Sequence, residues 1–426
     1  MMHICIINEY FYPDNAGGTG TVLSDLVRSL RETFSDIEVD VVTSKSLYRQ
    51  QSVSLAAYEE WNGVRIFRLA TPRPNGLSPL LRLGANLLFC LFALVKLMQL
   101  GKYDAVLIGT APPMVAMCAQ FLKWLKGTPF VYIVYDLEPD RSVSMKMLSE
   151  SHPAARLFRV SQKRWLHSAA KVVVLGRCMQ ERLTEVYSLP PEKVEVIPIG
   201  SDPEEIIPRS RQSRFREKHG ITGFVVLYSG NFGRYHNFDT VLNAATLLAR
   251  SKSSISFVLV GDGAQKEHIA HRVATEKIAS VRMFPFVSKE DYADLLATAD
   301  VSLVTLEPGM EGLCVPSKFY SILASGRPTI AAMSPVSEVA RVIDEAQCGV
   351  HFAQDSAEDL VRVLSALADD PGEVERLGQN ARSILLEKYS TKHLALRYHT
   401  TLLEAQVGGQ SDRSQPTELE TLSGKG

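Results

Sequence analysis

The sequence predicts an α/β fold made of two doubly wound domains, because the chain is long and one alternating pattern occurs twice. With 426 residues, the chain exceeds the size at which a single hydrophobic core usually keeps growing, about 250–300 residues. In each half, short β-branched runs alternate with amphipathic stretches. This alternation is typical of a parallel sheet with helices on both faces.

The first series of strands comprises HICIINEY, IEVDVVTS, DAVLIGT, TPFVYIVYD, KVVVLG and KVEVIP. The second series comprises FVVLYSG, SISFVLVGDG, SVRMFPF, ADVSLVTL and PTIAAM. The segment IPIGSDPEEIIP lies between the two series, and its prolines and glycine mark a domain junction near Asp202.

We therefore expect an N-terminal domain over 1–202 and a C-terminal domain over 203–389. A helix over 390–406 should pack back on the N-terminal domain. The polar tail 407–426 has almost no apolar periodicity and is expected to be disordered.

The overall charge argues against a nucleic-acid partner, since 46 Lys and Arg residues face 47 Asp and Glu residues. The six cysteines are scattered without a C-x-x-C pair, which favours a reducing cytosol over a zinc or redox centre. The N-terminus MMHICIINEYFY has no basic leader and no small-residue cleavage site, so it is interpreted as a first strand. We expect a cytoplasmic protein.

Two glycine-rich turns follow predicted strands. In the first, Gly17, Gly18 and Gly20 open a helix whose first amides would face an anion, although a loop that needs positive φ is an equal alternative. The turn matches a dinucleotide fingerprint poorly, because Val22 and Leu23 stand where the third glycine is needed.

The second turn, YSGNFGRYHNF, contains Gly230, Asn231, Gly233, Arg234 and His236. Its glycines allow the backbone to approach a phosphate and its arginine supplies a fork of donors, whereas the simpler alternative is an exposed turn.

The segment LEPGMEGLCVPSKFYSILASGRP is the densest in functional residue types. Glu311 and a turn at Gly312 precede Pro316, a plausible first helical residue. Lys318 would then lie in the first turn, where a cation is unfavourable unless an anion is bound nearby. The alternative is a tolerated surface lysine.

Acidic residues follow another predicted strand in YDLEPD, where Asp136, Glu138 and Asp140 lie at the ligand-binding edge of the sheet. An acid here could orient an acceptor hydroxyl or take its proton, or it could simply cap the next helix. The chain has no Asp-x-Asp, so a metal that bridges a diphosphate is not expected. His268 and His271 have no third ligand nearby in the sequence, which favours a solvated face.

Taken in order, these segments resemble glycosyltransferase family 4, whose members have the GT-B fold of two Rossmann-like domains. The resemblance rests on the GGTG loop, VIPIGSD, YSGNFGRYHNFDTVL, FVLVGDGAQ, ATADVSLVTLEPG and EGLCVPSKFYSILASGRP, and it spans about residues 3 to 405. VLYSGNFGR and CVPSKFYSILASGRP look like the subgroup that contains the colanic-acid and O-antigen fucosamine transferases.

The resemblance implies a role for each matching position. Glu311 would face the donor sugar and Asp136 the acceptor. The remaining donor-binding positions would be Gly17, Gly18, Thr19, Gly20, Gly230, Asn231, Arg234, Gly312, Leu313, Cys314, Val315, Ser317, Lys318 and Ser321, of which Gly312, Leu313 and Cys314 would offer backbone amides.

The chain departs from the family pattern at three places. The usual second Glu, which binds ribose, aligns with Phe319 or Ser321. Asn231 and His236 replace the usual Arg and Lys of the phosphate loop, which leaves Arg234 and Lys318 as the expected cations. Tyr135 stands where many members have a His.

The activity that the resemblance implies is transfer, with retained anomeric configuration, of a hexosyl or N-acetylhexosaminyl group. The donor would be a UDP- or GDP-sugar and the acceptor a saccharide hydroxyl in surface polysaccharide synthesis, with a polyprenyl-diphosphate-linked saccharide as one candidate. No cofactor and no metal would be needed. A nucleotide-sugar epimerase on the same fold and an inactive partner-binding scaffold are the alternatives.

One apolar run has two interpretations. Leu83 to Val95 is almost wholly apolar over thirteen positions, fewer than the ~20 that span a bilayer. Arg82, Lys96 and Lys102 flank the run, and Phe89 and Phe92 lie at helical spacing within it. It is either a helix buried on the first sheet or a peripheral contact with the inner face of the cytoplasmic membrane.

Overall fold

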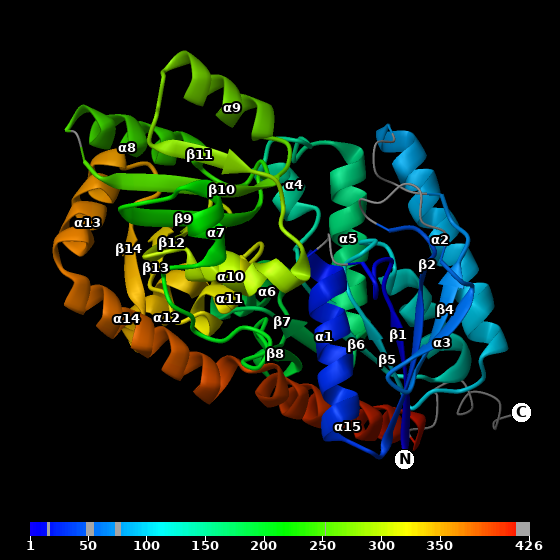
Figure 1. The fold of residues 1–426 in the computed structure, drawn as a ribbon. Helices are drawn as coiled ribbons and strands as arrows, with labels where there is room; N and C mark the ends of the chain where they lie inside the picture. The colour runs from blue at the N-terminus through cyan, green and yellow to red at the C-terminus, as the bar shows by residue number, and fades with distance from the viewer. Residues whose placement is uncertain (15–17, 48–54, 73–77, 252, 415–426) are drawn as a thin grey trace, which may run out of the picture.

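The computed structural model describes residues 1–14, 18–47, 55–72, 78–251 and 253–414, which form two α/β domains side by side (Figure 1). Each domain contains one sheet with helices on both of its faces. The predicted α/β class with two doubly wound units is confirmed.

The first domain contains an eight-stranded sheet in the order β3-β4-β2-β1-β5-β6-β7-β8. Its pairs are parallel except for the hairpin of β3 with β4. The strands are β1 (Met2–Ile7), β2 (Ile37–Ser44), β3 (Tyr58–Trp61), β4 (Val64–Leu69), β5 (Ala105–Ile108), β6 (Phe130–Val134), β7 (Lys171–Val174) and β8 (Val194–Val196).

The helices of this domain follow from the order of the strands, because right-handed crossovers to the two sides of β1 place helices on opposite faces. The first crossover helix is α1 (Gly18–Thr33), and the later ones are α2 (Pro79–Gln99), α3 (Ala116–Lys126), α4 (Asp140–Ser144), α5 (Pro153–Ser168) and α6 (Arg177–Tyr187). A short 3-10 turn over Pro191–Lys193 precedes β8.

The second domain contains a six-stranded parallel sheet in the order β11-β10-β9-β12-β13-β14. Its strands are β9 (Phe224–Asn231), β10 (Ile255–Asp262), β11 (Val281–Phe284), β12 (Val301–Thr305), β13 (Thr329–Ala332) and β14 (Gly349–Phe352). Its helices are α7 (Arg214–His219), α8 (Phe238–Arg250), α9 (Lys266–Thr275), α10 (Lys289–Ala297), α11 (Lys318–Ala324), α12 (Glu338–Ala346), α13 (Ala357–Asp369) and α14 (Pro371–Ile384), followed by a π-helical turn over Leu385–Tyr389.

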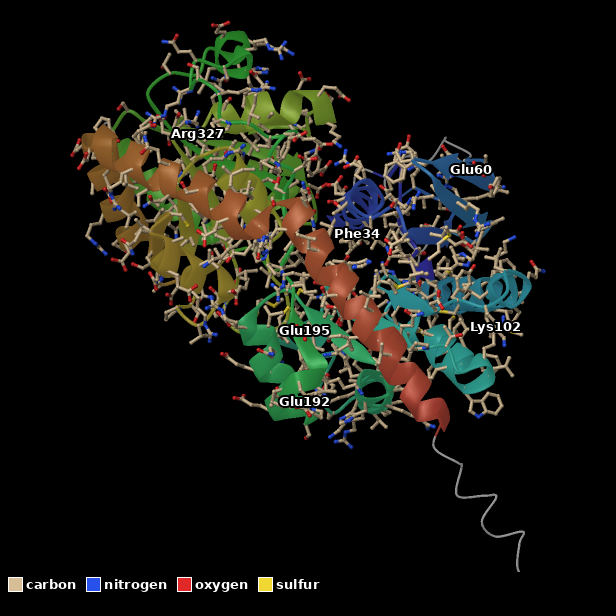
Figure 2. All side chains as sticks on the ribbon, turned by 90° about the horizontal axis from the view of Figure 1, so that it is seen from below. Phe34, Glu60, Lys102, Glu192, Glu195 and Arg327 are labelled. Atoms are coloured by element: carbon tan, nitrogen blue, oxygen red, sulfur yellow. The ribbon has the colours of Figure 1, made fainter. Side chains whose placement is uncertain are left out.

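The last helix, α15 (Thr391–Ser414), crosses back to the first domain and packs against α1, as the view from below shows (Figure 2). The rings of Phe34 and His399 stack there with centroids 3.8 Å apart. The chain passes between the domains twice. The two connecting segments lie side by side, because Ser201 and Ser390 form an isolated parallel bridge. The tail prediction was wrong in part: the helix continues through 407–414, and 415–426 lie outside the described residues.

The apolar run belongs to α2, a helix of 21 residues, so the expectation of a segment too short to span a bilayer was wrong. By length and composition, Leu80–Gln99 could cross a membrane, although the core helix of a soluble protein passes the same test. One face of α2 packs on the first sheet and buries Phe89 completely, because the helix lies over β2 and β4. The opposite face leaves Leu87, Leu91 and Val95 about half exposed. Phe89 and Phe92 therefore do not form one exposed aromatic pair.

Candidate active site

The turn between β12 and α11 carries the densest group of predicted site residues. Gly312 has φ +73°, and a Cβ there would lie 2.8 Å from the carbonyl oxygen of Cys178 in the first domain. Glycine is required on both counts. Pro316 was expected to be the first helical residue, but α11 begins at Lys318.

Lys318 is held in an unusual environment at the start of α11. Its Nζ lies 3.6 Å from the centroid of the Tyr228 ring, is buried, and has no hydrogen-bond partner among the described residues. A Cβ at Gly230 would lie 3.2 Å from this Nζ, so the glycine leaves room for the lysine. Burial lowers the pKa of Lys318 well below its usual value. A buried amine without a partner is costly, and an anion beside it would favour its charged form.

Glu311 is fixed by hydrogen bonds to both of its carboxylate oxygens. Oε1 accepts from Nε2 of Gln354 at 2.6 Å, and Oε2 accepts from the amide of Gly309 at 2.9 Å. The carbonyl of Gln354 in turn accepts from Asn237 and Thr240 at the start of α8. Gln354 was not predicted as a site residue; it follows β14 and lies 43 positions from Glu311.

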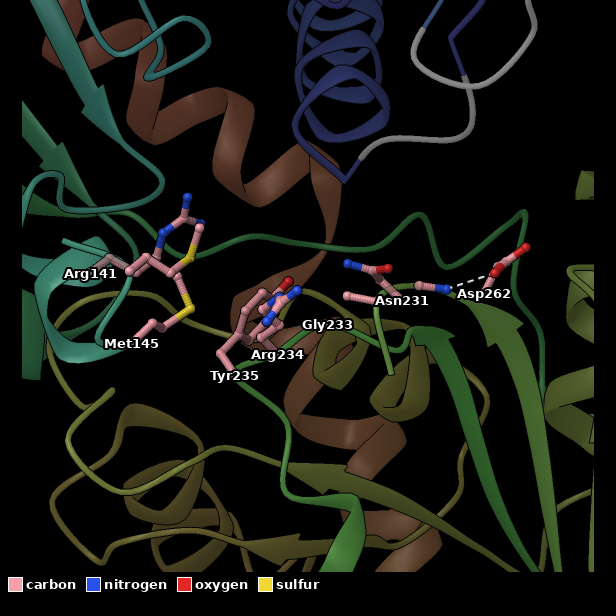
Figure 3. Close-up of a pocket in the computed structure, with 10 residues that line it drawn as sticks. Arg141, Met145, Asn231, Gly233, Arg234, Tyr235 and Asp262 are labelled. Carbon is pink, nitrogen blue, oxygen red and sulfur yellow. Dashed lines mark hydrogen bonds between the residues drawn. The ribbon is translucent and has the colours of Figure 1, made fainter. Parts of the chain in front are cut away.

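The turn after β9 forms one side of a cleft of about 660 Å³ between the domains. Asn231, Arg234 and Tyr235 line it from the second domain, and Arg141 in α4 and Met145 just after α4 line it from the first (Figure 3). The side chain of Arg234 is exposed. His236 is buried, donates from Nδ1 to the carbonyl of Thr305, and has a lowered pKa because of burial and the nearby Lys318. His236 is therefore uncharged.

The segment after β6 brings the first domain directly onto the Glu311 turn. Asp136 and Cys314 form an antiparallel bridge, and the amide of Leu137 donates to the carbonyl of Leu313 at 2.9 Å. The amide of Leu313 donates to the carbonyl oxygen of Met310. The expectation that this amide is free for a ligand was therefore wrong. The turn takes its shape from contacts with both domains.

The two aspartates of YDLEPD, Asp136 and Asp140, have different surroundings. Asp136 forms an ion pair at 2.7 Å with Arg141, which lines the cleft. Asp140 is buried and pairs with Arg159 and Arg182, which is a structural arrangement. Burial raises the pKa of Asp136 although its side chain keeps 31% of its surface, and Arg141 opposes that rise.

The first glycine loop lies opposite α11. A Cβ at Gly18 would lie 3.8 Å from Oγ of Ser317, so the N-terminal ends of α1 and α11 face each other. Thr19 and Gly20 follow in the first turn of α1, whereas Gly17 lies outside the described residues. The N-terminal ends of two helices, which carry the positive ends of the helix dipoles, thus lie close together.

The position of the usual ribose-binding Glu aligns with either Phe319 or Ser321, and these two side chains differ in burial. Phe319 is completely buried, whereas Ser321 is half-buried. Burial raises the pKa of Tyr292, and hydrogen bonds with Ser321 and Ser229 oppose that rise. Tyr135 is also buried, and its hydroxyl has no partner among the described residues.

No group of three or more His, Cys, Asp or Glu side chains that could hold a metal ion occurs in the described part of the chain. His268 instead pairs with Asp239 at 2.9 Å on an exposed face.

Comparisons with known proteins agree with this arrangement. Residues 17–200 match the model of a glycosyl transferase 4-like domain, and residues 211–384 match that of glycosyl transferases group 1. The chain is 30% identical over 309 residues to the probable glycosyltransferase WbjE of Pseudomonas aeruginosa, covering 70% of this chain and 74% of the relative. It is 24% identical over 325 residues to the putative colanic acid biosynthesis glycosyl transferase WcaI of Escherichia coli K12, covering 72% and 78%.

Solved structures share the fold at low identity. Sucrose-phosphate synthase from Thermosynechococcus elongatus superimposes with a TM-score of 0.76 at 17% identity, over 94% of this chain and 98% of that one. Anabaena HepE in complex with UDP-glucose gives a TM-score of 0.71 at 15% identity, over 94% and 99%. The chain therefore belongs to the family 4 glycosyltransferases of the GT-B fold and resembles the subgroup of WbjE and WcaI.

Proposed function

We propose that this glycosyltransferase moves a hexosyl or N-acetylhexosaminyl group from a UDP- or GDP-sugar to a saccharide hydroxyl, with retained configuration and without a metal or other cofactor. The acceptor is proposed to be a polyprenyl-diphosphate-linked saccharide used in surface polysaccharide synthesis. HepE, which shares the fold, holds UDP-glucose in its structure, and WcaI is named for colanic acid biosynthesis.

The observation that carries the proposal is the buried Nζ of Lys318, which has no acceptor among the described residues. A diphosphate placed between the starts of α1 and α11 would supply the missing negative charge. Arg234, on the wall of the cleft between the domains, is assigned as a second cation. Fixed positive groups stabilise a leaving diphosphate, and such electrostatic stabilisation is usually the largest contribution to catalysis.

We assign different roles in the reaction to the two acids, Glu311 and Asp136. The bond from the anomeric carbon to the diphosphate oxygen breaks, the nucleoside diphosphate leaves with the electron pair, and the acceptor oxygen bonds to that carbon. We assign Glu311 to the donor sugar hydroxyls. Asp136 orients the acceptor hydroxyl and takes its proton. The contact of Asp136 with the donor turn supports this division, because it brings the acceptor-side acid beside the donor site.

A lipid-linked acceptor requires an approach to the membrane, for which the outer surface of the first domain is suited. The helices α2, α3 and α5 are neighbours, and their outward apolar side chains include Leu91, Trp124 and Leu157, which are 54%, 78% and 69% exposed. Exposed Arg82, Arg156, Lys163 and Arg164 lie on the same helices and would attract anionic lipids. We propose that this surface rests on the inner face of the cytoplasmic membrane.

The proposal is tested by screening the purified chain against UDP- and GDP-sugars in excess EDTA. A donor that binds only the folded chain raises its midpoint of thermal unfolding. We expect at least one nucleotide sugar to do so, and the same compound to transfer its sugar to a hydroxyl acceptor, which an epimerase would not do. The absence of any such donor, or activity that returns only when magnesium or manganese is added, would contradict the proposal.

A further inference from the structure

Arg141 connects several groups at the wall of the cleft. Its Nη1 lies 2.7 Å from Oδ2 of Asp136, while Nε and Nη2 donate to Oε1 of Glu138 at 3.0 and 2.8 Å. The other oxygen of Glu138 accepts from the hydroxyl of Ser142 at 2.7 Å and from its amide at 3.3 Å. The guanidinium is therefore held in place independently of Asp136, because Glu138 has its own anchor.

Two further titratable groups near Asp136 come from the second domain. The thiol of Cys314 and the phenol of Tyr235 interact electrostatically with its carboxylate. Burial raises the pKa of both groups, that of Tyr235 to about 12, so neither carries a charge near neutrality. Glu138 adds a repulsive charge. Arg141 is thus the cation that opposes burial and Glu138 at Asp136.

We propose that Arg141 is a positioning residue: held by Glu138, which Ser142 anchors, it fixes the Asp136 carboxylate beside the cleft that Arg141 lines and keeps it charged before transfer. The inference rests on the proposed role of Asp136. A carboxylate can take the acceptor proton only if it is ionised when the acceptor binds. It must also be held within hydrogen-bond distance of the hydroxyl, which a side chain free to rotate would not be.

The direct test is a titration of the Asp136 carboxyl by NMR in the full chain labelled with 13C-aspartate, with Asp136→Asn used to assign its signal. Loss of the guanidinium removes an attractive charge that opposes the effect of burial, so Arg141→Gln should raise the pKa of Asp136. Arg141→Lys should restore part of the shift, because the ammonium keeps the charge but not the fork to Glu138. This readout needs no donor. An unchanged pKa in Arg141→Gln would overturn the proposal.

The second readout is the pH dependence of transfer from whichever UDP- or GDP-sugar the donor screen selects. Arg141→Gln should lower kcat/KM about 10- to 100-fold near pH 7 and move the acidic limb of the profile to higher pH. Added to Asp136→Asn, the same change should cost less than twofold, since the group it positions is already lost.

The outcomes separate the two claims. Equal losses from Arg141→Gln in both backgrounds, with an unmoved acidic limb, would show a merely structural arginine and overturn the inference. If Asp136→Asn transfers at the wild-type rate, the proposed role of Asp136 fails. If the wild-type chain transfers nothing, the proposed function fails, whatever the NMR titration shows.

Discussion

The ammonium of Lys318 lies over the ring of Tyr228, with 3.6 Å between Nζ and the ring centroid, and among the described residues it has no oxygen to receive its hydrogen bonds. The hydroxyl of Tyr228 donates to the carbonyl of Asn231, which fixes the ring below the glycine turn. Cation–π attraction offsets only part of the cost of burying an ammonium. The chain thus holds a buried amine without a hydrogen-bond acceptor at the place where donor phosphates are proposed to bind, and a bound phosphate would favour its charged form.

Removal of the Glu311 carboxylate should affect turnover more than binding. We expect Glu311→Gln to lower kcat about 100-fold or more while the affinity for UDP or GDP stays within about threefold, because the carboxylate is assigned to the sugar. Gln354→Leu should give a smaller loss of kcat, since it frees Oε1 of Glu311 without removing it. Steady-state kinetics and calorimetric titration make the comparison. A collapse of nucleotide affinity with normal turnover per bound donor would refute the assignment.

Stability should depend on pH through Glu9, whose pKa burial raises to about 7. The folded chain then binds a proton that the unfolded chain, with a Glu pKa near 4.3, has released, so the free energy of unfolding falls between about pH 4.5 and 7 as pH rises. Glu9→Gln mimics the neutral form. Its stability relative to wild type should rise by about 2 kcal/mol from pH 5 to pH 8.

Urea unfolding at the two pH values provides that measurement. Glu32→Gln, at an exposed position of α1, is the matched control and should follow the wild type. If Glu9→Gln and wild type keep a constant difference between pH 5 and pH 8, Glu9 is not a source of the pH dependence.

The Gly312 turn should not tolerate a side chain. Gly312→Ala combines a left-handed backbone with a Cβ 2.8 Å from the carbonyl oxygen of Cys178, so we expect a loss of about 2 to 4 kcal/mol in stability and weaker donor binding. Gly84→Ala is the control, because it lies within α2 with no atom within 4 Å of the new Cβ, and it should be neutral or stabilising by up to about 1 kcal/mol. Equal unfolding midpoints for the two variants would count against this picture of the turn.

The membrane surface can be tested with exposed residues alone. Leu91→Ser combined with Trp124→Ser should reduce co-sedimentation with phosphatidylglycerol liposomes by about tenfold, because apolar area no longer enters the interface. Nucleotide binding should be unaffected. Leu396→Ser combined with Leu403→Ser changes similarly exposed leucines on α15 and should bind liposomes as the wild type does. Wild-type chain that stays in the supernatant at low salt would exclude this surface.

Features encoded by local pattern could be predicted from the sequence. The two series of strands, the glycine turns and the placement of Lys318 at a helix start follow from periodicity and backbone preference, which neighbouring residues determine. The partner of a side chain could not be predicted in the same way. Gln354 reaches Glu311 only because β14 ends near β12 across β13, and no spacing in the sequence indicates that contact.

The same reason explains the errors. An almost continuous apolar run does not reveal which face of α2 meets the sheet, so Phe89 and Phe92 were grouped although only Phe89 is buried completely. Arg141 could not be predicted as a site residue, because a single arginine in a turn has no distinctive pattern and its role depends on Asp136 and Glu138 lying beside it in space.

Calorimetric titration of Lys318→Met with UDP and GDP tests the central claim most directly, beside Lys218→Met as a control at an exposed position of α7. Loss of a charge-assisted contact should weaken nucleotide binding about 10- to 100-fold in Lys318→Met, while Lys218→Met binds as wild type. Thermal stability of Lys318→Met should be unchanged or higher, since a buried amine without a hydrogen-bond partner is removed. Wild-type affinity for both nucleotides in Lys318→Met would contradict the assignment of this lysine to the donor diphosphate.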